Sequence, residues 1–126
     1  MLSAKIFLTL AAALLALAVA LGAFGAHALR ARLAPELLAV YQTAVQYHFY
    51  HALGLALIGL LAMHWPESGW LRAAGWSMVG GLILFSGSLY FLSLTGVRAL
   101  GAITPIGGLA FIAAWLLLAY AVWRSA

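Results

Sequence analysis

The stretch IFLTLAAALLALAVALGAFGA, residues 6–26, decides the fold class because it carries no charged side chain. At about 1.5 Å of rise per residue, a helix over these residues crosses a hydrocarbon core about 30 Å thick. Lys5 precedes the run, and Arg30 and Arg32 follow it. The run is therefore predicted to be a transmembrane helix.

The same run has an alternative interpretation as a cleaved secretory signal. Lys5 stands before it, and Ala26-His27-Ala28 has the small-x-small form of a cleavage site. However, the apolar stretch is longer than the usual signal core of about 7–15 residues, and basic residues flank it on both sides. These features favour a helix that is retained.

The whole chain has the composition of a membrane protein. Of its 126 residues, 67% are hydrophobic and 6% are charged, and the mean hydropathy is +1.14. The net charge of +4 comes from scattered basic residues, whereas a nucleic-acid-binding protein clusters them. The absence of cysteine excludes disulfides, thiolate metal sites and cysteine nucleophiles. We expect a single domain over residues 1–126, surrounded by a lipid bilayer and without a nucleic-acid partner.

Three further apolar segments are predicted to span the membrane: residues 43–63, 73–94 and 106–123. Pro35 and Glu36 suit the first turn of a helix, so the second helix is predicted to begin there and to extend beyond the hydrocarbon core. Thr104 followed by Pro105 predicts the N-cap and first turn of the fourth helix. The predicted fold is all-α, a four-transmembrane-helix bundle with short loops and both termini on the same side.

Charge does not assign an orientation to this bundle. Orientation normally follows the side that is richer in Lys and Arg. Here the two sides carry equal numbers: Lys5, Arg72 and Arg124 on the side of the termini, and Arg30, Arg32 and Arg98 on the other.

Small residues follow one stripe of the third predicted span. At 100° per residue the stripe is about 120° wide. Its members are Ala73, Ser77, Gly80, Gly81, Gly87 and Ser88. Small side chains let helices approach closely in lipid, so a helix-packing seam that includes Ser77, Gly80, Gly81 and Gly87 is favoured over a substrate path.

Polar residues gather near one membrane surface, where the first and third spans end and the second and fourth begin. They are predicted to form a polar chamber or ligand-binding site: His27, Gln46, Tyr47, His48, Tyr50, His51, Ser86, Ser88, Tyr90 and Thr104. On the second span the polar arc covers about 140°, with His48 about 60° further round, which is too wide to face lipid. Other spans, a second copy, a partner or a water-filled vestibule must enclose it, and His51, the deeper histidine, is the preferred candidate for ligand contact.

Four segments resemble the domain-of-unknown-function 423 family, which includes YgdD-type bacterial inner-membrane proteins and eukaryotic transmembrane protein 256. The segments are LGAFGAHAL (21–29), YQTAVQYHFYHAL (41–53), FSGSLYFLSLTG (85–96) and ITPIGGLAFIAAW (103–115). The resemblance implies a small four-helix inner-membrane protein that keeps its first span. Ala114 stands where Gly is expected before the Trp, a small-for-small change. The resemblance implies no established activity and no catalytic residues.

The histidines raise the question of a metal or haem. His48 and His51, at i and i+3, are weak candidates to hold a metal together with His27, or a haem through one imidazole. The cluster has no acidic ligand and no cysteine, so no cofactor is predicted. The competing interpretation is structural, with the imidazoles bonded to each other, to Gln46 and to backbone carbonyls.

Catalysis and proton transport are two further alternatives, and catalysis has the weaker support. Ser86 and Ser88 lack an orienting third group, because the chain's only acids are Glu36 and Glu67 and the latter lies on the opposite side. A proton relay could use a buried histidine, but the polar cluster reaches only part of the way across.

The sequence therefore predicts no catalytic residue and no enzyme. The preferred hypothesis is a non-enzymatic accessory or assembly component of the bacterial inner membrane, acting as a homo-oligomer or as a subunit of a larger membrane complex. The alternative is a small carrier, or a protein that binds a metal, a haem or another small ligand through His48 and His51.

Overall fold

Four long helical segments make up the protein in a computed structural model that describes residues 1–125. In chain order they are α1 (Leu2–Phe24) continued by the π-helix η1 (Gly25–Leu29); α2 (Pro35–His64); α3 (Gly69–Gly81) continued by the π-helix η2 (Leu82–Gly87) and α4 (Ser88–Thr95); and the 3₁₀-helix η3 (Arg98–Ala102) followed by α5 (Thr104–Ser125). All four segments are long and apolar enough to cross a membrane, and the described residues contain no strand. The all-α prediction is confirmed, and each predicted span lies within one segment.

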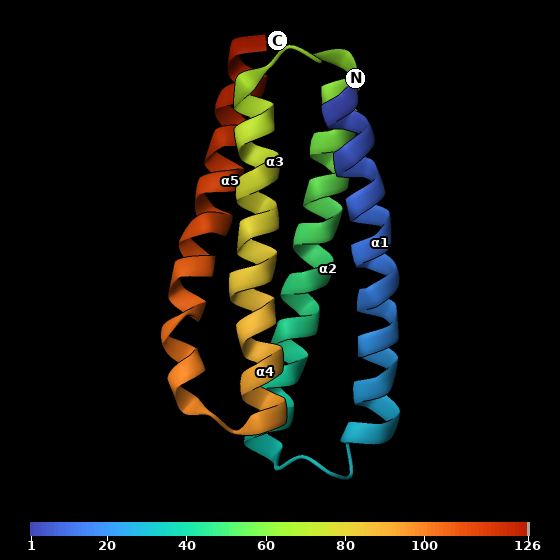
Figure 1. The fold of residues 1–126 in the computed structure, drawn as a ribbon, viewed down its shortest axis with the longest axis vertical. Coiled ribbons are helices and arrows are strands. Elements are labelled where there is room, and N and C mark those ends of the chain that lie inside the picture. Colours follow the sequence, from blue (N-terminus) through green and yellow to red (C-terminus); the bar gives the residue numbers. More distant parts are fainter. Residues whose placement is uncertain (126) are drawn as a thin grey trace.

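Both chain termini lie at one end of the bundle, together with the loop between α2 and α3 (Figure 1). We call this the terminal end. The loop after η1 and the loop between α4 and α5 lie at the opposite end, which we call the polar end. The predicted short loops and same-side termini are confirmed.

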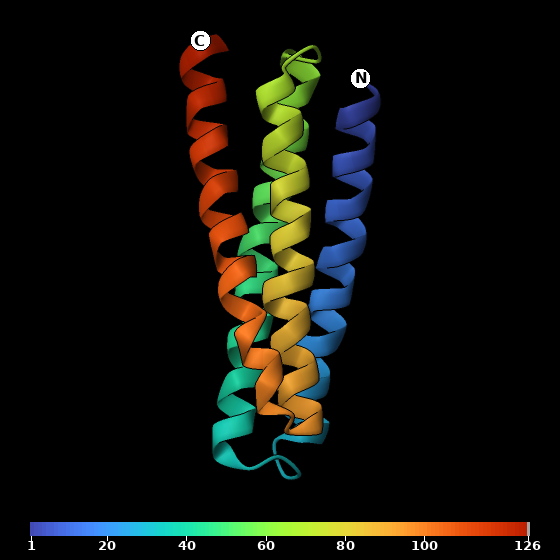
Figure 2. The same cartoon turned by 60° about the vertical axis from the view of Figure 1, so that its left-hand side comes forward.

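The four segments are arranged with α1 and α5 on the outside. Helix α1 packs mainly on α2, and α5 packs mainly on α3 and η2. Figure 2 shows α2 and the α3–η2–α4 segment lying between these two outer helices. One side of α2 therefore faces the other helices, while the other side faces outward.

The helix ends follow the sequence except at α5. Pro35 begins α2 as predicted, and Ser68 caps α3 by accepting a hydrogen bond from the Leu71 amide at 3.2 Å. The predicted N-cap role of Thr104 is wrong. The amides of the first turn bond instead to the Ile103 carbonyl, and the Thr104 hydroxyl points to Ser88 Oγ at 2.6 Å.

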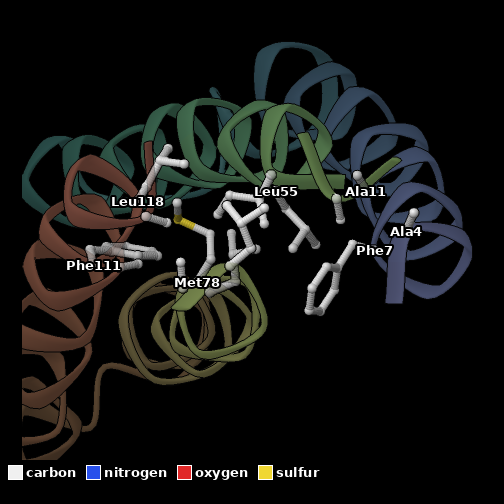
Figure 3. Packing of buried hydrophobic residues seen from close by; sticks show 14 residues of the cluster. Ala4, Phe7, Ala11, Leu55, Met78, Phe111 and Leu118 are labelled. Carbon is white, nitrogen blue, oxygen red and sulfur yellow. The ribbon is translucent and has the colours of Figure 1, made fainter. Parts of the chain in front are cut away.

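The apolar core lies between the helices toward the terminal end. Figure 3 shows Phe7 of α1, Leu55 of α2 and Met78 of α3 pointing into it, and all three are fully buried. Phe111 of α5 closes the core on the side of the polar end. In water, burying a side chain of this size stabilises a fold by about 1.5–3 kcal/mol. Lipid is itself apolar, so in a membrane the stabilisation from these side chains comes mainly from close packing.

Only part of the predicted small-residue seam is in contact with another helix. Ser77 Oγ donates to the Ala110 carbonyl of α5 at 2.7 Å, and Gly81 lies beneath the Phe111 ring. A Cβ on Gly80 would meet nothing within 4 Å, and one on Gly87 only its own helix's backbone at 4.0 Å. The predicted packing role of Gly80 and Gly87 is therefore wrong.

The closest approach of two helices occurs at a glycine outside that seam. Gly107 of α5 lies directly against the backbone of Leu84 and Phe85 in η2, so a Cβ there would overlap main-chain atoms. Helices that pack at a glycine in this way exploit its missing side chain. Gly107 thus fixes the position of α5 at the polar end.

Candidate functional site

The predicted chamber residues lie at the polar end, but they separate into groups that face different neighbours. His48 faces α1 and α4, whereas His51 faces α5. Gln46 and Tyr50 are exposed on the outer side of α2, and His27 is exposed in η1. The prediction of a single enclosed chamber is therefore wrong, because the polar arc of α2 passes from the bundle interior to its outer surface.

His48 and Tyr90 form a buried pair between α2 and α4. The exposed fraction of His48 is 3%, and its Nδ1 lies 2.8 Å from the Tyr90 hydroxyl. In one tautomer the hydroxyl donates to Nδ1 and the ring proton lies on Nε2, and in the other Nδ1–H donates to the hydroxyl. The described residues offer Nε2 no hydrogen bond, although the Leu14 backbone of α1 approaches the ring. Buried polar atoms without a hydrogen-bond partner are uncommon in folded proteins. The Nε2 atom of His48 is therefore a candidate for contact with a group outside the chain.

An apolar groove runs beside this pair, between α1 and the η2–α4 segment. Its volume is about 540 Å³. Leucines of α1 line one wall, and His48, Ser86, Ser88 and Tyr90 supply its few polar groups. The groove has room for an apolar molecule, but Nε2 itself is covered by protein atoms.

His51 is held by aromatic rings and by its own helix. Its Nδ1–H donates to the Tyr47 carbonyl at 2.8 Å. The imidazole stacks on Phe111 with a centroid separation of 3.5 Å and an angle of 11° between the planes, and Trp115 lies 5.9 Å away. A side chain fixed on three sides acts as a packing element, so the preference for His51 as the ligand-contacting residue finds no support in its contacts.

The serines and Thr104 bond to nearby oxygens. Ser86 Oγ donates across to the Ala44 carbonyl of α2 at 3.0 Å. Ser88 lies 2.6 Å from Thr104 and 3.0 Å from the Phe85 carbonyl. No serine in residues 1–125 forms a hydrogen bond with a histidine, so the described residues contain no serine–histidine pair of the kind that hydrolases use.

The three candidate metal ligands do not converge. His48 and His51 face different helices, and His27 is exposed on η1. Across residues 1–125 no group of three His, Cys, Asp or Glu side chains could hold a metal ion. A haem ligated through one imidazole would have to displace either the Tyr90 contact or the Phe111 stack.

The outer side of α2 carries a polar strip that sequence reasoning only partly found. Gln42, Gln46 and Tyr50 follow one another at intervals of four residues, and all three are exposed, with Tyr50 at 54%. Their side chains form no hydrogen bond to any described residue. The two glutamines also line a pocket of about 290 Å³ between α2 and the end of α1. Gln42 and Gln46 are the only two carboxamides of the chain and lie one helical turn apart. This feature of the sequence could have identified Gln42 as a member of the strip.

Comparison with known proteins gives the chain's relatives. The family model described as "Protein of unknown function (DUF423)" matches residues 21–108. The UPF0382 membrane protein YwdK of Bacillus subtilis (strain 168) is 50% identical over 117 residues, which cover 93% of this chain and 95% of that protein. The UPF0382 membrane protein SERP0230 of Staphylococcus epidermidis is 47% identical over 122 residues, covering 97% and 98%. No solved structure matches. The membrane names of these relatives agree with the four spanning helices.

Proposed function

The chain belongs to the DUF423 family of membrane proteins, and from this premise we propose that it is a non-enzymatic accessory or assembly component of the bacterial plasma (inner) membrane. In this role it binds another transmembrane helix through the outer side of α2. The observation that carries the proposal is the polar strip of Gln42, Gln46 and Tyr50, which faces outward.

The depth of Gln46 supports this role. Val45 packs beside Gly22 of α1, and the helix from Gly22 to Arg30 is about 12 Å long. A glutamine side chain at this level is too short to reach the membrane surface along the helix. An amide that faces hydrocarbon without a partner costs several kcal/mol, roughly 4–8 on the cyclohexane scale. A partner helix that bonds to the amide removes this cost.

The bonding of the inner polar groups supports a non-enzymatic role. The side chains of His51, Ser86 and Ser88 all bond to backbone carbonyls of the bundle. The Ser86 bond joins η2 to α2, whereas the His51 and Ser88 bonds stay within their own helical segments, and all three leave these groups committed to structure. The polar strip is thus the polar surface that is free to bind another protein.

Site-specific photo-crosslinking in the membranes of living cells tests the proposal. A benzophenone amino acid replaces Leu57, which lies on the polar-strip side of α2 and is 45% exposed. The matched control position is Leu116 of α5, which is 65% exposed. We expect a discrete protein adduct from position 57 and only lipid adducts from position 116. Lipid adducts alone at both positions would contradict the proposal.

A second candidate function is a small carrier or ligand-binding protein that uses the groove beside His48. The supporting observation is the Nε2 atom, which has no partner in the described chain and lies at a groove of about 540 Å³. The fitting ligand is a long apolar molecule with one acceptor oxygen, and its contact with Nε2 would require α1 to move outward at Leu14, whose backbone approaches the ring.

Two glycines provide a matched test of this second function. Gly87→Leu fills the groove, whereas Gly80→Leu adds the same side chain at an open position outside it. Mass spectrometry of lipids that co-purify with the protein should show one species lost from Gly87→Leu and kept by Gly80→Leu. An equal lipid content in both variants would exclude the groove as a binding site. An absorption spectrum and metal analysis of the same samples test the haem and metal alternatives.

A further inference from the structure

We propose that the partner of this surface is a second copy of the chain, which binds through α2 in parallel orientation. The contact is the α2 seam, defined as Gln46, Tyr50, Leu53, Leu57 and Leu60. This inference rests on the proposed function, because it names the helix that the polar strip binds.

The spacing of the α2 seam is that of a coiled coil. Its members follow one another at intervals of four, three, four and three residues, which is the a/d repeat of two helices that pack side by side. The residues share one stripe about 80° wide at 100° per residue. All are exposed, with Tyr50 at 54%, Leu53 at 55%, Leu57 at 45% and Leu60 at 54%. A helix with the same repeat packs into this stripe by inserting its side chains between those of α2.

The chemistry of Gln46 selects a second copy as that helix. A carboxamide is both donor and acceptor, so it is complementary to itself. Two parallel α2 helices related by a two-fold axis along the membrane normal place each seam residue against its own equivalent. Gln46 then meets Gln46 of the partner subunit, and each amide gains a hydrogen bond. A single polar residue in such a seam also fixes its register.

An antiparallel pair would lack this match. Reversal about the centre of the seam sets Gln46 against Leu60 and leaves both amides without partners in hydrocarbon. The leucines alone would pack in either direction, since their contacts are non-directional. Gln46 therefore decides the parallel arrangement.

Other exposed faces of the bundle share this spacing, as that of α5 does, but none carries a carboxamide. The outward residues of α5, such as Leu109, Ile112 and Leu116, and of α1, such as Leu17 and Val19, are apolar. Gln42 and Gln46 are the only carboxamides in the chain, and both lie on the outer side of α2. Lipid satisfies the apolar faces, whereas the α2 seam requires a polar partner.

Disulfide cross-linking tests the inference, because the natural chain has no cysteine and each variant therefore carries one thiol. Leu53→Cys, Leu57→Cys and Leu60→Cys probe the seam, while Leu116→Cys and Val19→Cys are controls on other helices that are more exposed than the seam residues. Two copies with different tags are produced together and oxidised in native membranes. We expect disulfide-linked dimers that contain both tags at all three seam positions and at neither control.

Substitution of Gln46 adds the chemical test. In the Leu57→Cys background, Gln46→Leu should weaken association roughly tenfold, equivalent to about 1.4 kcal/mol for the lost amide bonds. Gln46→Asn keeps a carboxamide and should retain part of the association. Gln42→Leu lies one turn closer to the membrane surface, at the edge of the same stripe but off the four–three spacing, and should change it less.

Several results would overturn the inference, and they separate it from the proposed function. Dimers at Leu53→Cys but not at Leu60→Cys indicate an antiparallel pair and contradict the parallel seam. Equal cross-linking at the controls, or unchanged association of Gln46→Leu, also contradicts it. A photo-adduct at position 57 to a different protein, without disulfide dimers, overturns the second copy but leaves the proposed function standing. If neither a protein photo-adduct at position 57 nor a disulfide-linked dimer forms, both the inference and the proposed function are refuted.

Discussion

At the polar end, both sides of α2 carry polar side chains, but these side chains have different surroundings. On the inner side, His48 and His51 are buried and bonded to Tyr90 and to the Tyr47 carbonyl. On the outer side, Gln46 and Tyr50 are exposed and bond to no described residue. The comparison shows that polarity within a span does not by itself mark a functional site. The inner groups hold the fold together, and the outer groups are available to a partner.

The largest effect is expected where a side chain is added inside the bundle. Gly107→Ala forces a Cβ into the backbone of η2, which cannot move aside without separating α5 from it. We expect a loss of about 3 kcal/mol in the free energy of unfolding, at the upper end for overpacking. Gly80→Ala is the matched control, because no atom lies within 4 Å of its added Cβ. Thermal unfolding in detergent measures both, and equal melting temperatures would refute the close contact.

The next largest loss of stability is expected at only one of two adjacent residues of α2. His51→Ala removes a ring stacked on Phe111 and leaves a cavity, which should cost about 2 kcal/mol. Tyr50→Ala removes an exposed ring and should change the free energy of unfolding by less than about 0.5 kcal/mol. Denaturant titration of the two variants gives the difference. A folded, fully stable His51→Ala protein would contradict the structural role of this histidine.

A smaller effect is expected from single hydroxyl groups. Tyr90→Phe deprives the buried His48 Nδ1 of its bond and should cost about 1–2 kcal/mol. Tyr47→Phe removes a hydroxyl for which the described chain provides no hydrogen bond, so it should be nearly neutral. Thermal unfolding of both variants tests this order. If Tyr47→Phe lowers the melting temperature more than Tyr90→Phe does, the hydrogen bond between His48 and Tyr90 does not have the stabilising role assigned to it.

The sequence was sufficient to predict the fold because a long apolar run has few alternatives in lipid. Hydrogen-bonding needs restrict such runs to helices, and four runs place both termini together. The topology also predicted that His48, Ser86 and Thr104 lie toward the same end, which the structure bears out. These inferences depend on length and hydropathy, which are properties of the chain itself.

The grouping of the polar residues could not be predicted, because it depends on which neighbour stands on which side. A helical wheel gives the angle between His48 and Gln46, but it does not locate α1 and α5 around α2. The packing seam shows the same limit. Gly80 and Gly87 lie together at one edge of the predicted stripe, and the wheel does not reveal that α5 packs against the other part, where Ser77 and Gly81 lie.

The smallest expected effect on folding belongs to Gln46→Leu, and this variant separates the two sides of α2 in one sample. The measurement follows thermal unfolding and self-association of the same lipid-embedded sample beside the unaltered protein. If the inner side of α2 serves folding and the outer side serves association, the melting temperature stays within about 1–2 °C while self-association falls roughly tenfold. A melting temperature lowered as far as in His51→Ala, or self-association equal to that of the unaltered protein, would show that the two sides of α2 are not divided in this way.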